Sequence, residues 1–170
     1  MNQVHGDDIF EITSIIDEPT CDALITTVPG IALAVLVADC IPLLLTSQTV
    51  VGAVHVGRRG LVNSIALKTI EAMKKLGAGQ IHAQLGPSIC RGCYEVGGDL
   101  ADEIHQTHPA ATAITTSGSP SLDLPQALIA DLVSVGITYE ASGICTVENE
   151  QYFSYRRDNI TGRTAGVVWL

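Results

Sequence analysis

The longest apolar run of the chain, residues 31–38, ends abruptly at a carboxylate and a thiol, Asp39 and Cys40. The run is continuous and consists of Ile, Ala, Leu and Val, which is typical of a strand buried on both faces of a sheet. It is far shorter than the roughly 20 residues that a membrane-spanning helix needs. The segment therefore predicts a buried strand in a layered fold, with two chemically useful side chains at its end.

Strands and helices are mixed along the rest of the sequence. Short apolar segments bounded by turn residues predict strands at 21–28, 42–46, 50–56, 81–85, 137–139 and 164–169. Apolar residues at helical spacing predict helices over 61–76, 97–108 and, after residues 122–124, up to 135. Because no linker or repeat interrupts the chain, we expect a single domain over 1–170. Its class is α/β or α+β, a layered mixed β-sheet with helices packed on it.

The charge balance limits the classes of partner. The formal net charge is −9, from 18 acidic and 9 basic residues. An acidic surface repels phosphate backbones and anionic lipid, so we expect neither nucleic acid nor a membrane as partner. A local basic pocket for a small anionic substrate remains compatible with this charge. The odd number of cysteines, five, and the polar first ten residues favour a cytoplasmic protein with free or metal-bound thiols.

Three short segments, residues 3–6, 38–40 and 54–57, carry a candidate metal site. They supply His5, Cys40 and His55. One thiolate and two imidazoles suit zinc, and three protein ligands leave a fourth position open, as in catalytic sites. Asp39 is a candidate to orient a ligand or to act as a base. Taken alone, these residues also fit an ordinary role, with Cys40 as a small core residue and the histidines as satisfied polar groups.

Other candidates carry weaker signals. Cys90 and Cys93 form a C-x-x-C pair, but no second pair supports a zinc ribbon. We expect ordinary loop cysteines there, with redox or metal roles as the alternative. The pair Arg156 and Arg157 fits a solvated face or an anion site equally well.

The ordered set of segments resembles the laccase-domain family. The matching segments are Gln3-Val4-His5-Gly6, residues 38–43, residues 55–60, residues 85–89 with 94–97, residues 122–124, residues 145–146, and residues 153–158 with 161–163. The resemblance implies a layered fold like that of cysteine-dependent toxin deamidases, with zinc held by His5, Cys40 and His55. It also implies phosphorolysis of adenosine, inosine, guanosine and methylthioadenosine, and deamination of adenosine. Family members usually carry a segment before the Gln-x-His-Gly motif and often Trp at the position of Arg58. We therefore expect an N-terminally short member with some sheet and substrate contacts missing.

Our hypothesis is a zinc-dependent purine nucleoside phosphorylase, a monomer or homodimer that binds a purine nucleoside and phosphate. Cys40, His55 and Asp39 are the expected catalytic residues. Arg59, and as a weaker candidate Arg157, would bind phosphate. One rival is a copper-dependent polyphenol oxidase, which needs more histidine ligands than this chain readily supplies. The others are a non-catalytic metal- and nucleoside-binding protein, and a hydrolase with Cys40 as nucleophile and His55 as base.

Overall fold

A six-stranded mixed sheet forms the centre of the computed structural model, which describes residues 1–15 and 17–170. The strands, in spatial order, are β1 (Ile9–Glu11), β2 (Ala23–Thr26), β5 (Val51–Val56), β4 (Ile41–Thr46), β6 (His82–Leu85) and β9 (Thr138–Ala141). The two edge pairs, β1 with β2 and β6 with β9, are parallel, and the inner pairs are antiparallel. The predicted mixed sheet and α+β class are confirmed.

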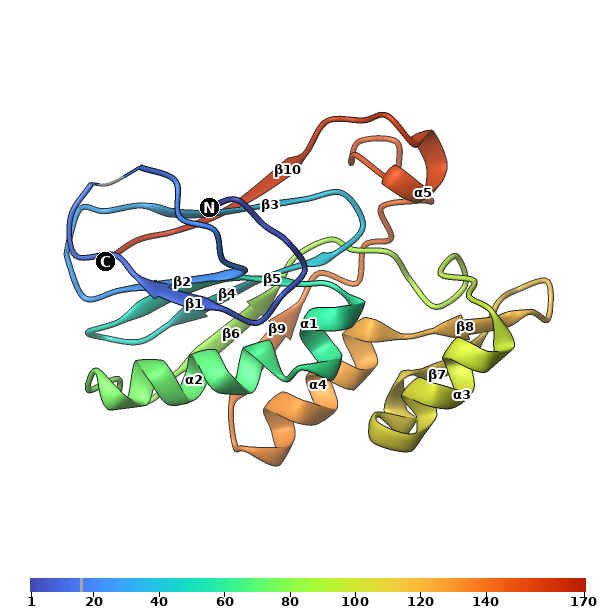
Figure 1. Cartoon of the computed structure of the whole chain (residues 1–170), viewed down its shortest axis with the longest axis horizontal. Helices are drawn as coiled ribbons and strands as arrows, with labels where there is room; N and C mark the ends of the chain where they lie inside the picture. The colour runs from blue at the N-terminus through green and yellow to red at the C-terminus, as the bar shows by residue number, and fades with distance from the viewer. Residues whose placement is uncertain (16) are drawn as a thin grey trace.

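Helices cover one face of this sheet (Figure 1). They are α2 (Ile65–Lys75), α4 (Leu124–Ser134) and the short α1 (Arg58–Val62), whereas α3 (Gly98–Thr107) lies beside the sheet and packs on residues 109–122. Side chains such as Ile70, Met73 and Leu128 lie in the core between helices and sheet. Each such side chain contributes about 1.5–3 kcal/mol when it leaves water. This layer therefore supplies most of the hydrophobic stabilisation.

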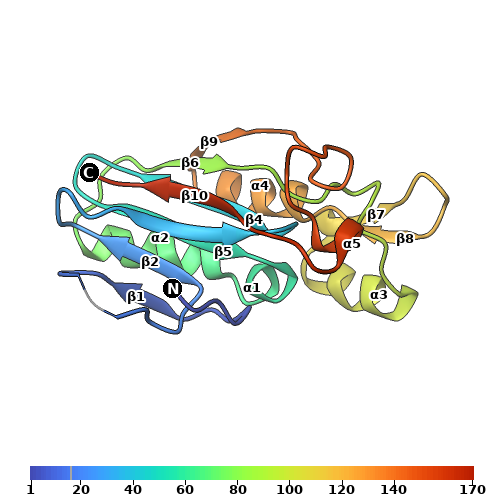
Figure 2. The same cartoon turned by 90° about the horizontal axis from the view of Figure 1, so that it is seen from above.

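A two-stranded ribbon covers the opposite face of the sheet (Figure 2). It pairs β3 (Leu33–Val37) with β10 (Thr164–Val168) in antiparallel fashion. The inner face of β3 is buried, whereas Leu36 on its outer face is 45% exposed. The prediction that residues 31–38 are buried on both faces is therefore wrong. The strand lies in an outer layer, and its apolar side chains meet the sheet on one side only.

The helix predicted over 61–76 begins earlier and is interrupted. Ser64 has φ 59°, which separates α1 from α2. The remaining elements are η1 (Pro109–Ala111), β7 (Thr112–Ile114), β8 (Pro120–Leu122) and α5 (Tyr155–Asp158). Within residues 1–15 and 17–170, no helix combines the length and the apolar character that crossing a membrane requires.

Candidate active site

The pairing register of β5 with its two neighbours brings the first site residues together. Ile41 of β4 pairs with Val56 of β5, so Cys40, one residue before β4, lies beside the end of β5 where His55 stands. On the other side Ala23 of β2 pairs with Val54, and the backbone N–H of His55 donates to the carbonyl of Asp22 at 2.8 Å. The sheet thus places a thiol, an imidazole and a carboxylate at one end of three adjacent strands.

Asp22 organises this end of the sheet. Its carboxylate accepts hydrogen bonds from the backbone N–H groups of Val4, His5 and Gly6 at 3.2, 3.0 and 2.7 Å, and from Nδ1 of His55 at 2.7 Å. Burial by itself raises the pKa of Asp22, but these hydrogen bonds together outweigh burial and hold the pKa below its ordinary value. The carboxylate therefore stays ionised, although the residue is fully buried.

The N-terminal segment is fixed by a second pair of hydrogen bonds. The side-chain amide of Gln3 donates to the carbonyl of Leu36 at 2.7 Å and accepts from its N–H at 2.9 Å, as a neighbouring strand would. His5 follows with φ 60°, in the left-handed region that non-glycine residues seldom adopt. Such backbone is retained where surrounding contacts impose it. Here the contacts to Gln3 and Asp22 direct the His5 ring toward Cys40.

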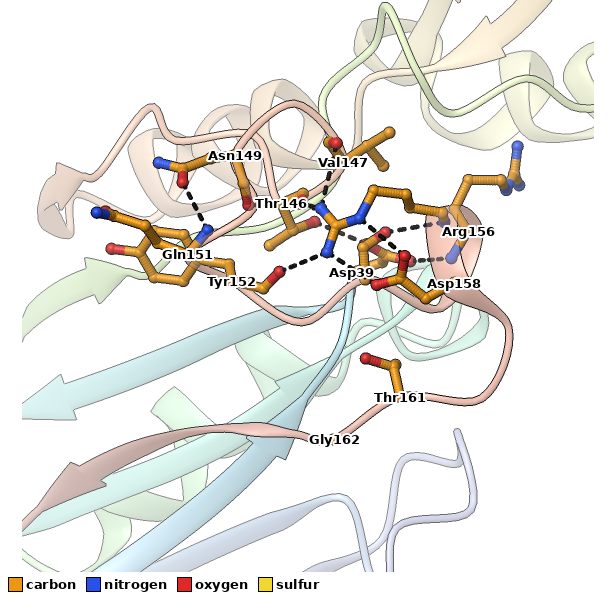
Figure 3. Close-up of polar contacts among 12 residues, drawn as sticks. Asp39, Thr146, Val147, Asn149, Gln151, Tyr152, Arg156, Asp158, Thr161 and Gly162 are labelled. Carbon is orange, nitrogen blue, oxygen red and sulfur yellow. Dashed lines mark hydrogen bonds and ion pairs between the residues drawn. The ribbon is translucent and has the colours of Figure 1, made fainter.

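Asp39 is equally constrained and positions Cys40. Its backbone has φ 93°, and both carboxylate oxygens are occupied (Figure 3). Oδ1 accepts from Oγ1 of Thr146 at 2.7 Å, and Oδ2 accepts from the backbone N–H of Arg156 at 2.7 Å. A carboxylate with both oxygens engaged in this way is a positioning group. The structure favours this role for Asp39 over that of a base.

The three predicted metal ligands meet. One donor atom from each of His5, Cys40 and His55 lies within 4.8 Å of the other two. Sγ of Cys40 is 3.7 Å from Nε2 of His5, close to the roughly 3.5 Å between sulfur and nitrogen ligands of a tetrahedral zinc ion. Because Nδ1 of His55 is held by Asp22, the other ring nitrogen of His55 is available as a ligand.

Electrostatics and packing agree with a metal at this position. Burial lowers the pKa of His55, which favours the neutral imidazole that binds metals. Burial and the neighbouring carboxylate of Asp39 raise the pKa of Cys40 to about 12, so without a cation the thiol stays protonated and is a poor nucleophile. At Gly57 an added Cβ would lie 2.9 Å from the His5 ring and 3.1 Å from Sγ of Cys40. The donor set and the space around it therefore fit a bound zinc ion.

A cavity of about 560 Å³ opens beside the three ligands. Three of the nine basic residues of this acidic chain line it, namely Arg58, Arg156 and Arg163. The ring of Tyr94 forms part of the wall, and the guanidinium carbon of Arg156 lies 5.2 Å from its centroid. Burial raises the pKa of Tyr94, so its hydroxyl remains a hydrogen-bond donor at neutral pH. The cavity has the size and the mixed lining of a small-molecule site.

The two arginines predicted for phosphate lie elsewhere. Arg59 is exposed and is not among the residues that line the cavity, whereas its neighbour Arg58 is. The guanidinium of Arg157 donates to the carbonyls of Thr146 and Tyr152 at 2.7 and 2.9 Å and to the carboxylate of Asp158. Arg157 therefore stabilises a loop. Their assignment to phosphate stays a prediction that this placement does not favour, and the direction of an arginine side chain on a short helix cannot be deduced from sequence.

Four residues of the site were given no role from the sequence. Arg58, Tyr94 and Arg163 line the cavity; they stand in segments that resemble the family, but their residue types alone do not distinguish them from surface residues. Asp22 did carry a signal: it is an ionisable residue within an apolar segment that predicts a strand. A buried carboxylate requires partners, and this one was a detectable marker of the site.

Known proteins are similar to this chain over its whole length. A family model described as multi-copper polyphenol oxidoreductase laccase matches residues 1–170. A Streptomyces griseus protein named purine nucleoside phosphorylase ORF3 is 43% identical over 179 residues, which cover 100% of this chain and 73% of that relative. A Deinococcus radiodurans protein named purine nucleoside phosphorylase is 39% identical, with 100% and 69% of the two chains covered.

Solved structures agree with the sequence relatives. The crystal structure of Neisseria meningitidis protein NMB0706 has a TM-score of 0.88 and 32% identity, and the match covers 100% of this chain and 73% of that one. YlmD from Geobacillus stearothermophilus has a TM-score of 0.86 and 29% identity, with 99% and 71% covered. The resemblance seen in the sequence motifs is confirmed: the chain belongs to the multi-copper polyphenol oxidoreductase laccase family, several of whose members are named purine nucleoside phosphorylases.

Proposed function

We propose that the protein is a zinc-dependent purine nucleoside phosphorylase whose reaction takes place in the cavity beside His5, Cys40 and His55. One observation carries the proposal. The metal-ligand trio and three arginines line the same cavity in a chain with a net charge of −9. The three guanidinium groups outnumber the two carboxylates of the lining, Glu18 and Asp39, and this local excess of positive charge in an acidic chain suits a substrate as strongly anionic as phosphate. The names of the relatives support the same reaction.

In phosphorolysis, phosphate attacks the anomeric carbon of the ribose while the purine departs. Arg58 and Arg163 are our candidates to hold the phosphate, because both line the cavity and neither side chain carries an ion pair among the described residues. Fixed donors aimed at the charge of the transition state lower its energy more than solvent can. Arg58 replaces Arg59 in this role.

The rest of the lining suits the nucleoside. Tyr94 and Ile89 offer an aromatic and an aliphatic surface to a purine or a sugar. The Tyr94 hydroxyl, kept protonated by burial, can donate to a substrate oxygen or nitrogen. When bound by the trio, zinc would supply Lewis acidity at the edge of this surface. Asp22 and Asp39 hold the ligating residues in place, so the reacting groups meet without further rearrangement.

Copper chemistry receives less support from the donor set. The chain has five histidines, and three of them, His82, His105 and His108, lie outside the His5, Cys40 and His55 group. Their Nδ1 atoms contact threonine hydroxyls at 3.0, 2.9 and 3.0 Å. Copper oxidases with several metal ions need more imidazole ligands at one place, so zinc is the metal we propose.

The experiment mixes zinc-loaded protein with adenosine, with and without phosphate, and identifies the products by chromatography. Adenine and ribose 1-phosphate that form only with phosphate are the expected result. A Cys40→Ala variant should lose this activity. Inosine as the product would establish deamination in place of phosphorolysis. No turnover with stoichiometric zinc and bound adenosine would identify a binding protein and overturn the proposal.

A further inference from the structure

A second cluster of metal-binding side chains lies where two loops meet, apart from the trio of His5, Cys40 and His55. Cys90 and Cys93 lie in the loop after β6, and Cys145 and Glu148 lie in the loop after β9. One donor atom from each of these four residues lies within 4.8 Å of the others. The pairing of the strands explains the meeting. Because β6 and β9 are neighbouring parallel strands, the loops that follow them leave the sheet at the same end.

The approach of the two loops is fixed by backbone contacts. A parallel bridge joins Ser88 to Cys145 beyond the ends of the strands. The N–H of Thr146 donates to the carbonyl of Ser88 at 3.1 Å, and the N–H of Cys90 points at Sγ of Cys145, 3.4 Å away. N–H groups directed at a sulfur stabilise the thiolate form, which is the form that binds metals. The side chains are therefore brought together by the fold.

Two sulfur–oxygen distances in the cluster match those around a tetrahedral metal ion. Oε1 of Glu148 lies 3.5 Å from Sγ of Cys93 and 3.8 Å from Sγ of Cys90. A zinc ion with sulfur ligands at about 2.3 Å and an oxygen ligand at about 2.0 Å separates sulfur from oxygen by about 3.5 Å. We propose that Cys90, Cys93, Cys145 and Glu148 form a second zinc site, distinct from the trio at the cavity. Its four protein ligands close the coordination sphere, which makes the site structural.

Two arginines stabilise the loops that carry these ligands. Nη1 of Arg156 donates to the carbonyls of Cys93 and Glu95 at 3.4 and 3.0 Å. Arg157 donates to the carbonyls of Thr146 and Val147 at 2.7 and 3.3 Å. The Arg156 guanidinium thus lies beside the loop that carries Cys93, where its charge offsets part of the negative charge of three thiolates and a carboxylate, while the Arg157 guanidinium is paired with Asp158.

The site would act on the cavity through the same loops. The first loop carries Ile89 and Tyr94 of the cavity wall. The second carries Thr146, which donates to Asp39 next to Cys40. A metal that joins the loops would therefore rigidify both the wall of the cavity and the support of a catalytic-site ligand.

A disulfide between Cys90 and Cys93 is the alternative for a C-x-x-C pair. All five cysteines are free thiols in the structure. A disulfide between these two residues would also leave unexplained why Cys145 and Glu148 converge on them. Three thiols and a carboxylate at mutual ligand distances favour metal over redox chemistry.

The experiment counts metal ions. The whole chain is reconstituted with zinc under reducing conditions, passed through a desalting column, and analysed by inductively coupled plasma mass spectrometry. Cys93→Ser and Cys145→Ser should each contain one zinc fewer per chain than the wild type. Cys40→Ser should retain the second site and lose only the ion at the trio. The deciding quantity is the difference between wild type and Cys93→Ser, so the result does not depend on whether the trio binds zinc or the enzyme is active.

Cys21→Ser is the matched thiol control, because Cys21 is buried outside both groups. It should keep the full zinc content. Should the cysteine variants fail to fold, Glu148→Gln is compared with Glu150→Gln, which changes an exposed glutamate two residues away. Only Glu148→Gln should release zinc to a chelator at least tenfold faster. Equal zinc in wild type and Cys93→Ser, or a Cys90–Cys93 disulfide that persists during reconstitution, would overturn the proposal.

Discussion

Nδ1 of His55 donates to Oδ1 of Asp22 at 2.7 Å, and the same carboxylate holds the backbone of the segment that carries His5. One buried side chain therefore orients two of the three proposed ligands, although it touches no proposed metal position itself. Outer partners of this kind fix the tautomer and the direction of a ligating imidazole.

Replacing Asp22 with asparagine should weaken zinc binding at the trio by about 10–100-fold. The substitution keeps the size of the side chain but removes the charge that several N–H donors share. The dissociation constant is measured by competition with a chromophoric chelator. Asp123→Asn, which alters a carboxylate that caps α4 outside both metal groups, is the control. Unchanged affinity in Asp22→Asn would remove Asp22 from the site.

The metal-free protein should lose stability in two acid steps. Burial lowers the pKa of His55, so its contribution is present above the unfolded value of about 6.5 and is lost as pH falls through the lower folded value. Hydrogen bonding keeps the pKa of Asp22 below its unfolded value of about 3.9, so its contribution is lost only at still lower pH. Urea midpoints measured across this range should show both steps. His55→Gln should abolish the upper step, and exposed His105→Gln should preserve it.

Gly57→Ala should abolish or strongly weaken zinc binding at the trio. The added methyl would stand 2.9 Å from the His5 ring and 3.1 Å from the Cys40 sulfur, closer than carbon atoms approach without displacement. Gly79→Ala provides the comparison, because a Cβ at Gly79 meets nothing within 4 Å. Zinc content and thermal unfolding are measured for both. A Gly57→Ala variant with normal zinc content would show that the ligands are placed differently.

Arg58→Ala and Arg59→Ala form a natural pair of neighbouring substitutions. Arg58→Ala removes a charged donor from the cavity. It should raise the KM for phosphate about 10–100-fold, as expected when a charge-assisted hydrogen bond worth about 1.5–3 kcal/mol is removed. Arg59→Ala should leave the KM for phosphate within about twofold, because surface substitutions away from a site have small effects. Steady-state kinetics at saturating nucleoside measure both. The reverse order of effects would restore the sequence-based assignment of Arg59.

Much of the fold could be predicted from the sequence, because apolar periodicity reports burial directly. The segment 50–56 predicts β5, and all six residues of that strand are buried. Residues 31–38 were wrongly predicted to be buried on both faces, although Leu36 is exposed. An unbroken apolar run cannot distinguish a central strand from a strand in an outer layer. The position of β3 in the outer layer depends on its pairing with β10, which comes from a distant part of the chain.

Site residues could be predicted where the residue type and its immediate neighbours in the sequence indicate the chemistry. Residue types and flanking glycine or aspartate made His5, Cys40 and His55 candidates, the resemblance to the laccase-domain family implied that they form a ligand set, and the structure brings them together. The partners of Cys90 and Cys93 were not identified, because Cys145 and Glu148 reach them only through the parallel pairing of β6 with β9. Contacts between loops at one end of a sheet produce no periodic pattern in the sequence.

The pairing of β3 with β10 has a consequence for folding during translation. The ribosome adds His5 long before Arg163, which comes just before β10. Both residues nevertheless line one cavity. Contacts so distant along the chain form slowly, and a ribosome releases residues at about 5–20 per second. The sheet and α2 can assemble while translation continues. The cavity is completed only after residues 163–168 emerge, so residues 1–162 leave the ribosome before the site is finished.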